Sequence, residues 1–347
     1  MLFNPDACHD NITKNLTPAL GFNESRDFNA WKKEVREKLI DLAGIHEIEK
    51  NDCPLALNII AEEQKDGYKQ IQFSFTSETA CEVPAYILIP DGDKKKYPVA
   101  ITMQGHSSGF HNSVGEIHPG DESYHPRGAF AVQAVKNGYI GLCIENRSMG
   151  CRGPKEPERK RLGGGCNYPG RVALTLGRTL LGERMWDLSK LIDLISTFKE
   201  FEMCDTDKIL ITGNSGGGTI SYYAACYDER IKLSAPSCAF CSYDTSIYPK
   251  EHCVCNHIPN IRRYFEMADI SCLLAPRNVV VFAGSQDSIF PLYGVEEAFE
   301  HMGKIYDKAG VSRDKLKLVI TPKGHWWCHD LIWPILKEET TKLGWWK

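Results

Sequence analysis

The sequence has no apolar run long enough to span a bilayer, and residues 1–10 show neither the basic segment nor the apolar core of a signal peptide. We therefore expect no membrane partner and a cytoplasmic location. An excess of one charge is also missing, because the formal net charge is -4 and the basic cluster at residues 152–161 contains acids and prolines. This balance excludes a strongly basic surface for nucleic acid and favours a solvated loop.

Cysteine, in contrast, is plentiful, with 14 in 347 residues. A chain of this length can bury a large core without disulfides, so we expect free thiols in a reducing compartment. One group has residue types and spacings that could hold zinc. Its second half is C-x-C rather than C-x-x-C, and its segment lies where a pocket wall is expected, so we predict a packed loop, no metal and no other cofactor. The group comprises Cys238, Cys241, His252, Cys253, Cys255 and His257.

The most informative stretch is Gly213-Asn214-Ser215-Gly216-Gly217. An apolar, β-branched run at 208–212 precedes it, and a helix-compatible segment at 219–226 follows it. Strand, tight turn and helix are the context of the nucleophile elbow of α/β-hydrolases, in which a serine lies on a strained turn between small neighbours. The start of the helix would direct N–H groups and the positive end of its dipole at a developing oxyanion. Ser215 is therefore the predicted nucleophile.

A serine nucleophile needs a base, and the base needs an acid to orient it. Strand-like runs at 278–284 and 315–321 are followed by Asp287 and His325. This order of serine, acid and histidine is the one that the elbow predicts. Asp244, after the run at 231–235, is a rival acid, and His329 is a weaker rival base because it follows the loop rather than lying in it.

An oxyanion hole needs two N–H donors. Gly216, directly after the nucleophile, is the first predicted donor. The second should follow the strand at 97–103, where Gly105 allows a close approach of the backbone. We predict the backbone N–H of His106, with Ser107 as the alternative, and expect the His106 side chain to be a polar group at the pocket rim.

The order of elements predicts an α/β fold with about eight strands, a mostly parallel sheet and helices on both faces. A helix at 28–42 lies outside the sheet, and residues 71–75 and 84–90 are predicted as antiparallel edge strands. We expect residues 1–68 to form a helical extension packed on a catalytic domain at 69–347, with both in one structural unit.

Two loops should shape the pocket. Arg147, just after the strand at 139–144, could contact substrate, although pairing with Glu145 or Glu183 is the more economical prediction. Residues 151–171 are long enough for a lid or for a contact in a homo-oligomer. Arg184 and Asp187 are spaced as an ion pair on a long helix within 173–200.

The chain resembles the acetyl-xylan-esterase-like and dienelactone-hydrolase-like bacterial α/β-hydrolases from about residue 70 onward. This resemblance implies that Ser215, Asp287 and His325 form the triad. At Asn214, directly before the predicted nucleophile, the chain differs from many members of this family. The acyl group that the enzyme would prefer therefore stays open. The motifs that carry it are Gly177–Asp187, the elbow, His252–Asn256 with Ile258-Pro259, Ala275-Pro276-Arg277 and Gly324-His325.

The resemblance implies a serine esterase that removes acetyl or other short acyl groups from a carbohydrate-like or small polar ester. Without an export signal, a small or oligosaccharide ester is the expected partner rather than a polymer. The pocket edge is expected to include Arg147, His106, Trp326 and Trp327, because aromatic and hydrogen-bonding groups suit sugar rings. Asn214, expected to face the acyl pocket, is a further predicted substrate contact. Two alternatives stay open: a serine peptidase of this fold, and a non-catalytic metal or ligand binder.

Overall fold

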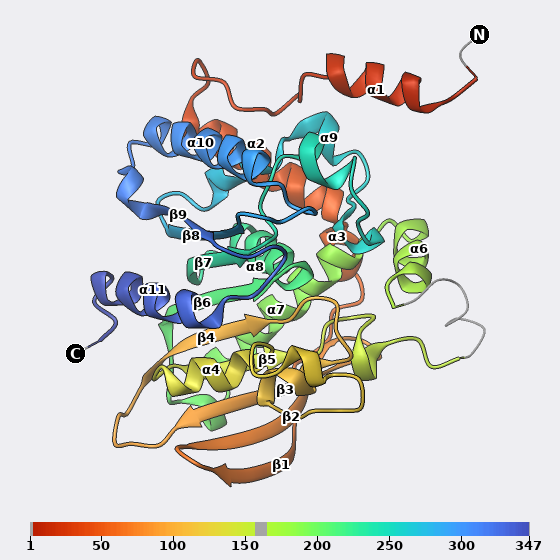
Figure 1. Cartoon of the computed structure of the whole chain (residues 1–347). Helices are drawn as coiled ribbons and strands as arrows, with labels where there is room; N and C mark the ends of the chain where they lie inside the picture. Colours follow the sequence, from red (N-terminus) through yellow and green to blue (C-terminus); the bar gives the residue numbers. More distant parts are fainter. Residues whose placement is uncertain (1–2, 157–164, 347) are drawn as a thin grey trace.

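A computed structural model describes residues 3–156 and 165–346 of the chain. Within these residues the strands form a single sheet in the order β1-β2-β3-β5-β4-β6-β7-β8-β9, with helices on both sides of it (Figure 1). The strands are β1 Leu57–Lys65, β2 Tyr68–Glu78, β3 Cys81–Pro90, β4 Tyr97–Met103, β5 Ile140–Ile144, β6 Cys204–Asn214, β7 Ile231–Ser237, β8 Asn278–Gly284 and β9 Leu316–Thr321.

Pairing is antiparallel from β1 to β5 and parallel from β5 through β9. This is the predicted α/β-hydrolase fold with a mostly parallel sheet. The helices are α1 Asp6–Asn15, α2 Phe28–Ala43, α3 Ile45–Glu49, α4 Phe130–Lys136, α6 Asn167–Thr175, α7 Leu180–Thr197, α8 Gly216–Tyr227, α9 Ile261–Tyr264, α10 Leu292–Lys308 and α11 His329–Lys342.

The outermost strand, β1, was not predicted. Its last four residues, Glu62 to Lys65, are polar and exposed, and Ile59 and Ile60 before them are exposed too, so no alternating pattern marks a buried face. It pairs with β2 in antiparallel register, Lys65 opposite Tyr68. The sheet therefore begins within the segment 1–68 that was expected to be helical, and it has nine strands in the described residues rather than about eight.

Successive side chains of a strand point to opposite faces of the sheet, so the central strands contribute residues to two cores. Val99 and Ile101 of β4 face the core that contains α2, α7, α8 and α10, and Ala100 faces the core that contains α4 and α11. The long helix α7 is buried along most of its length, and the Thr179 side chain caps it by accepting from the Gly182 N–H. The sheet is therefore held rigidly between two helical layers.

Parallel strands place their carboxyl ends at one edge of a sheet. Here that edge carries the segments after β4, β6, β7, β8 and β9, which are distant in sequence. The expected lid or oligomer contact at 151–171 follows β5; its residues 157–164 lie outside the described residues, and it ends in the start of α6. In the part of the chain described, no helix combines the length and the apolar character needed to cross a membrane.

Candidate active site

Ser215 lies on a strained turn between β6 and α8. Its φ is 57° and its ψ is -126°, a conformation that a side chain disfavours. The Ser215 N–H donates to the Ser237 carbonyl at 2.9 Å, and its own carbonyl accepts from the Thr219 N–H at 2.8 Å. The elbow is possible because α8 starts close to β4: a Cβ at Gly217 would lie 2.0 Å from the Met103 carbonyl oxygen.

Asp287 and His325 are joined as the sequence predicts. His325 Nδ1 is 2.9 Å from Asp287 Oδ2, and the other carboxylate oxygen accepts from the N–H groups of Ile289 and Phe290 at 2.8 and 3.0 Å. Burial opposes ionisation of Asp287, but the His325 contact and the two backbone donors hold the pKa of this carboxyl below its usual range. The Phe290 ring lies nearly parallel to the imidazole, at 13°, with the ring centres 5.8 Å apart.

The rival residues lie elsewhere in the fold. Asp244 is exposed and pairs with Arg262 at 3.1 Å. His329 is the first residue of α11, as expected, whereas His325 lies in the loop after β9. Ser215 and His325 line the same cavity, of about 290 Å³. The geometry therefore brings one acid, one imidazole and one serine to the carboxyl edge of the sheet.

The loop after β4 approaches the elbow closely. A Cβ at Gly105 would lie 2.8 Å from the Asn214 carbonyl oxygen and 3.6 Å from the Gly216 nitrogen. The loop is tied down on both sides, because Asn146 donates to the Gln104 carbonyl at 3.1 Å and the Tyr124 hydroxyl donates to the His106 carbonyl at 3.0 Å. The backbone of this loop therefore lies against the elbow and the start of α8, where Gly216 follows Ser215.

The His106 side chain does more than the predicted rim residue. Its Nε2 is 3.4 Å from Cys255 Sγ and 3.6 Å from Cys166 Sγ. Contacts with the Cys166 and Cys253 thiols hold the pKa of Cys255 well below its usual range. The sequence-based group of six Cys and His residues does not form one cluster: of its members, Cys253 and Cys255 group with His106 and Cys166. His252 instead bonds Ser246 at 3.0 Å, and Cys241 contacts Thr245.

Cys238 lies beside the histidine–aspartate pair. Its sulfur, one carboxylate oxygen of Asp287 and one ring nitrogen of His325 lie within 4.8 Å of one another. Burial raises the pKa of the Cys238 thiol to about 12, so it is a neutral neighbour. Its positive φ of 49°, directly after β7, could not be seen in the sequence.

Several cavity residues come from a segment that sequence reasoning passed over. Tyr124 and Arg127, from the long connection between β4 and α4, line the cavity with Asn112. The Arg127 guanidinium lies 3.7 Å from the centre of the Trp326 ring, so Trp326 reaches the site through this stack. The connection after β4 is long and polar, and this was the sequence signal that could have indicated a contribution to the cavity.

Arg147 and Trp327, two predicted substrate contacts, are held in structural contacts instead. For Arg147 the sequence favoured pairing with Glu145 or Glu183, and the pair with Glu183 does form, at 3.6 Å. Arg147 pairs with Asp187 at 2.7 Å and with Glu78 at 2.6 Å, and its side chain is buried in this network. Trp327 is fully buried and donates its indole N–H to Gln133 at 2.9 Å. Asn214 does line the cavity, but its side-chain oxygen accepts from the Ser237 hydroxyl at 2.9 Å. Of the two tryptophans, only Trp326 is therefore left exposed, at 41%.

The predicted ion pair between Arg184 and Asp187 is also wrong. Asp187 pairs with Arg147 and Arg152. Arg184 turns the other way and donates to the Arg147 carbonyl at 2.8 Å and to Cys166 Sγ at 3.2 Å.

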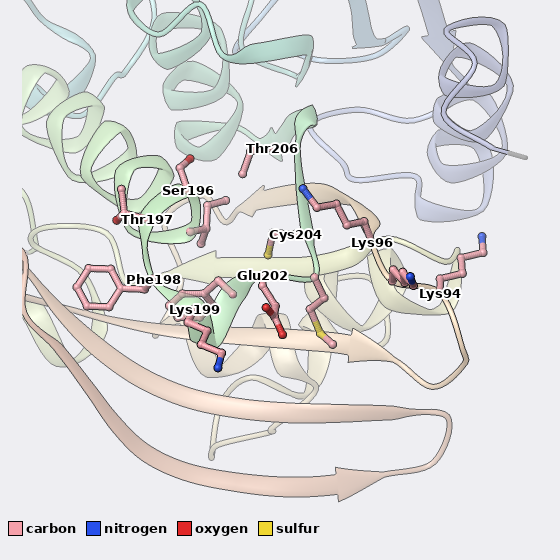
Figure 2. Close-up of a pocket in the computed structure, with 13 residues that line it drawn as sticks. Lys94, Lys96, Ser196, Thr197, Phe198, Lys199, Glu202, Cys204 and Thr206 are labelled. Carbon is pink, nitrogen blue, oxygen red and sulfur yellow. The ribbon is translucent and has the colours of Figure 1, made fainter.

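A larger hollow, of about 670 Å³, lies at the opposite end of the central strands. Figure 2 shows its lining, which includes Lys94 and Lys96 before β4 and Glu202 and Cys204 at the start of β6. β4 and β6 are parallel, so this hollow lies at their amino ends, away from Ser215. The smaller cavity is therefore the candidate active site despite its size.

The chain belongs to the Abhydrolase family, whose model matches residues 7–232. This match includes Ser215 and ends before Asp287 and His325. Over 248 residues the chain is 23% identical to YtaP, a provisionally named hydrolase of Bacillus subtilis (strain 168), with 70% of this chain and 78% of YtaP covered.

Solved structures share the fold. A provisionally identified acetyl xylan esterase from Bacteroides fragilis NCTC 9343 superposes with a TM-score of 0.77 at 20% identity, covering 98% of this chain and 96% of that one. A glucuronoyl esterase from Solibacter usitatus superposes with a TM-score of 0.65 at 14% identity, covering 96% and 98%. These similarities confirm the α/β-hydrolase fold.

The Arg147 network predicts a stability effect. Arg147→Met removes the buried partner of Asp187 and Glu78 and leaves carboxylates partly uncompensated, so the free energy of unfolding should fall by about 3 kcal/mol. Denaturant unfolding checks it. Arg313→Met is the control, because Arg313 makes a comparable double ion pair with Glu300 and Asp307 on the surface and should lose far less. Equal losses for the two variants would contradict a structural role for Arg147.

Proposed function

We propose that this chain is a serine carboxylic-ester hydrolase that acts through an acyl-enzyme and removes acetyl or other short acyl groups from a carbohydrate-like or small polar ester. The observation that carries the proposal is the strained Ser215, in one cavity with a His325 that is bonded to Asp287 at 2.9 Å. A serine on such an elbow is exposed to substrate while its neighbours are held by the sheet.

In the proposed mechanism, His325 takes the proton of the Ser215 hydroxyl as the oxygen attacks the ester carbonyl. The ionised Asp287 holds the imidazole through Nδ1 and stabilises its charged form. Collapse of the tetrahedral intermediate expels the alcohol, which receives the proton from His325. Water, activated by the same imidazole, then attacks the acyl-enzyme and releases the acid.

Charge on the carbonyl oxygen would be stabilised by the N–H of Gly216 and by an N–H of the loop after β4, for which His106 is the assigned residue. The close approach of Gly105 to Gly216 supports this assignment. Donors fixed before the reaction are effective because they do not reorganise as charge develops.

The cavity supports a small substrate with polar groups. Its volume is about 290 Å³, and its lining includes Asn112, Tyr124 and Arg127 beside Ser215. A lipase would present a broad apolar groove instead. Proteins of the same fold include, by name, the acetyl xylan esterase and the glucuronoyl esterase, and this supports an ester of a carbohydrate-like alcohol or acid.

Replacing the nucleophile is the direct test. Ser215→Ala should lower kcat for an activated acetate ester by about a million-fold, because no other group forms the acyl-enzyme. Steady-state and burst kinetics measure the loss. Ser107→Ala is the matched control, since Ser107 lines the same cavity and loses only a hydroxyl. Substantial turnover by Ser215→Ala would remove this serine from its role.

The acid assignment gives a second test. Asp287→Asn should reduce kcat about ten-thousand-fold, because the amide would favour the wrong tautomer of His325. Asp244→Asn, which breaks only an exposed pair with Arg262, should retain most activity. A larger loss for Asp244→Asn than for Asp287→Asn would transfer the acid to the segment after β7.

Substrate class is tested with a series of esters. Rates on p-nitrophenyl esters should fall steeply from acetate through butyrate to octanoate, because the cavity is short of room for a long chain. Acetylated sugars should release acetate, measured enzymatically, with Ser215→Ala as the blank. Faster hydrolysis of octanoate would indicate a lipase, and good cleavage of aryl amides without acetate release would indicate a peptidase.

A further inference from the structure

Four potential metal ligands meet beside the candidate active site: His106, Cys166, Cys253 and Cys255. They come from three separate segments, which are the loop after β4, the residue before α6 and the short turn at 253–256. Cys166 and Cys255 are buried and Cys253 is half-buried, while His106 is exposed toward the cavity. Among the described residues, these side chains take part in no step of the proposed mechanism.

Two of the separations between these ligand atoms fit a tetrahedral zinc site. His106 Nε2 is 3.4 Å from Cys255 Sγ and 3.6 Å from Cys166 Sγ, and all four ligand atoms lie within 4.8 Å of one another. Zinc bonds of about 2.3 Å to sulfur and about 2.0 Å to nitrogen require tetrahedral edges of about 3.6 Å between sulfur and nitrogen. The separations of 3.4 and 3.6 Å are therefore close to the edges that a central zinc ion would impose.

Charge at the cluster supports the same interpretation. Arg184 is 1% exposed and directs an N–H at Cys166 Sγ from 3.2 Å. Its Nε has no hydrogen-bond partner in the described part of the chain. A buried guanidinium needs a negative partner. Zinc(II) with three thiolates carries one net negative charge, which Arg184 would balance.

We propose that His106, Cys166, Cys253 and Cys255 bind one zinc ion in a closed, structural site. Three thiolates and one imidazole nitrogen fill a tetrahedral shell, so no position is left for water or substrate. Soft sulfur ligands favour zinc over magnesium or calcium. Each cysteine gives up its proton on binding, and the His106 ring coordinates as the neutral form through Nε2.

The site cross-links segments that the sheet does not hold. Its surroundings are a small apolar cluster of Met149, Leu180, Cys166 and Cys255, separate from the two large cores. The turn at 253–256 is also tied to the elbow helix, because Thr219 donates to Asn256 at 3.0 Å. On the other side, a Cβ at Gly216 would lie 3.2 Å from Nδ1 of His106. The ion would therefore fix the loop that approaches Gly216.

Metal content tests the proposal without reference to activity. The full-length chain, purified with reductant and without chelator, should contain about one zinc per chain by elemental analysis. Cys166→Ser and Cys255→Ser should each lower the zinc content at least about tenfold, because the ion loses a thiolate ligand. Cobalt(II) substitution should give the intense visible bands of tetrahedral thiolate coordination in wild type and weaken them in both variants.

Cys241→Ser is the matched control. Cys241 is a buried cysteine of the sequence-based group but not of this cluster, so its variant should keep the zinc. Circular dichroism of every variant separates ligand loss from unfolding. Loss of zinc from a folded Cys241→Ser together with its retention in Cys255→Ser would overturn the assignment. So would a metal-free wild type in which thiol counting shows a disulfide among Cys166, Cys253 and Cys255.

One consequence rests on the proposed function. If the ion fixes the loop that supplies the second oxyanion donor, zinc removal by a chelator should lower kcat about 100- to 1,000-fold, and added zinc should restore it. Metal content and activity are read separately, so a zinc protein that hydrolyses no ester would leave the site standing and refute the esterase. A zinc-free protein with full esterase activity would refute the zinc site and leave the esterase proposal standing.

Discussion

The close crossing of the loop after β4, the end of β6 and the start of α8 is the constraint on which the site depends. Met103 pairs with Gly213 in the parallel ladder, and a Cβ at Gly217 would collide with the Met103 carbonyl oxygen at 2.0 Å. This contact holds Ser215 at a φ of 57°, which an unsupported turn would relax. The same register brings Gly105 against the elbow. The strained serine and the oxyanion loop are therefore two results of one strand pairing.

The sequence predicted what depends on the sheet. Buried parallel strands are continuous apolar runs, so β4 and β8 were found with their observed bounds. Because the carboxyl ends of such strands share an edge, Asp287 and His325 could be expected to meet, and they do at 2.9 Å. The strand β1 was not predicted because it lies at the edge of the sheet. There Glu62 to Lys65 face water, so the sequence needs no alternating apolar pattern.

The directions of side chains and the contacts between loops could not be predicted from the sequence. Arg147 follows a strand at the catalytic edge, as a substrate contact would, but Asp187 on α7 draws it into the core. Trp326 and Trp327 are neighbours, yet one is exposed and the other is fully buried. The sequence singled out Cys253 and Cys255 but grouped them with Cys238 and Cys241. The cluster instead joins them to Cys166 and His106, which are distant in sequence, so no local spacing motif could show it.

The loops at the catalytic edge lack the ladder hydrogen bonds of the strands, so each needs an anchor of its own. The loop after β9 has one in the bond between His325 and Asp287, and the loop after β4 has Asn146 and Tyr124. In the described residues, Cys166 and the turn at 253–256 pack in a small apolar cluster with Met149 and Leu180. Such a cluster buries too little surface to fix two loops tightly. A four-ligand metal ion would provide the missing constraint at small volume, which is why it is expected here rather than in the two large cores.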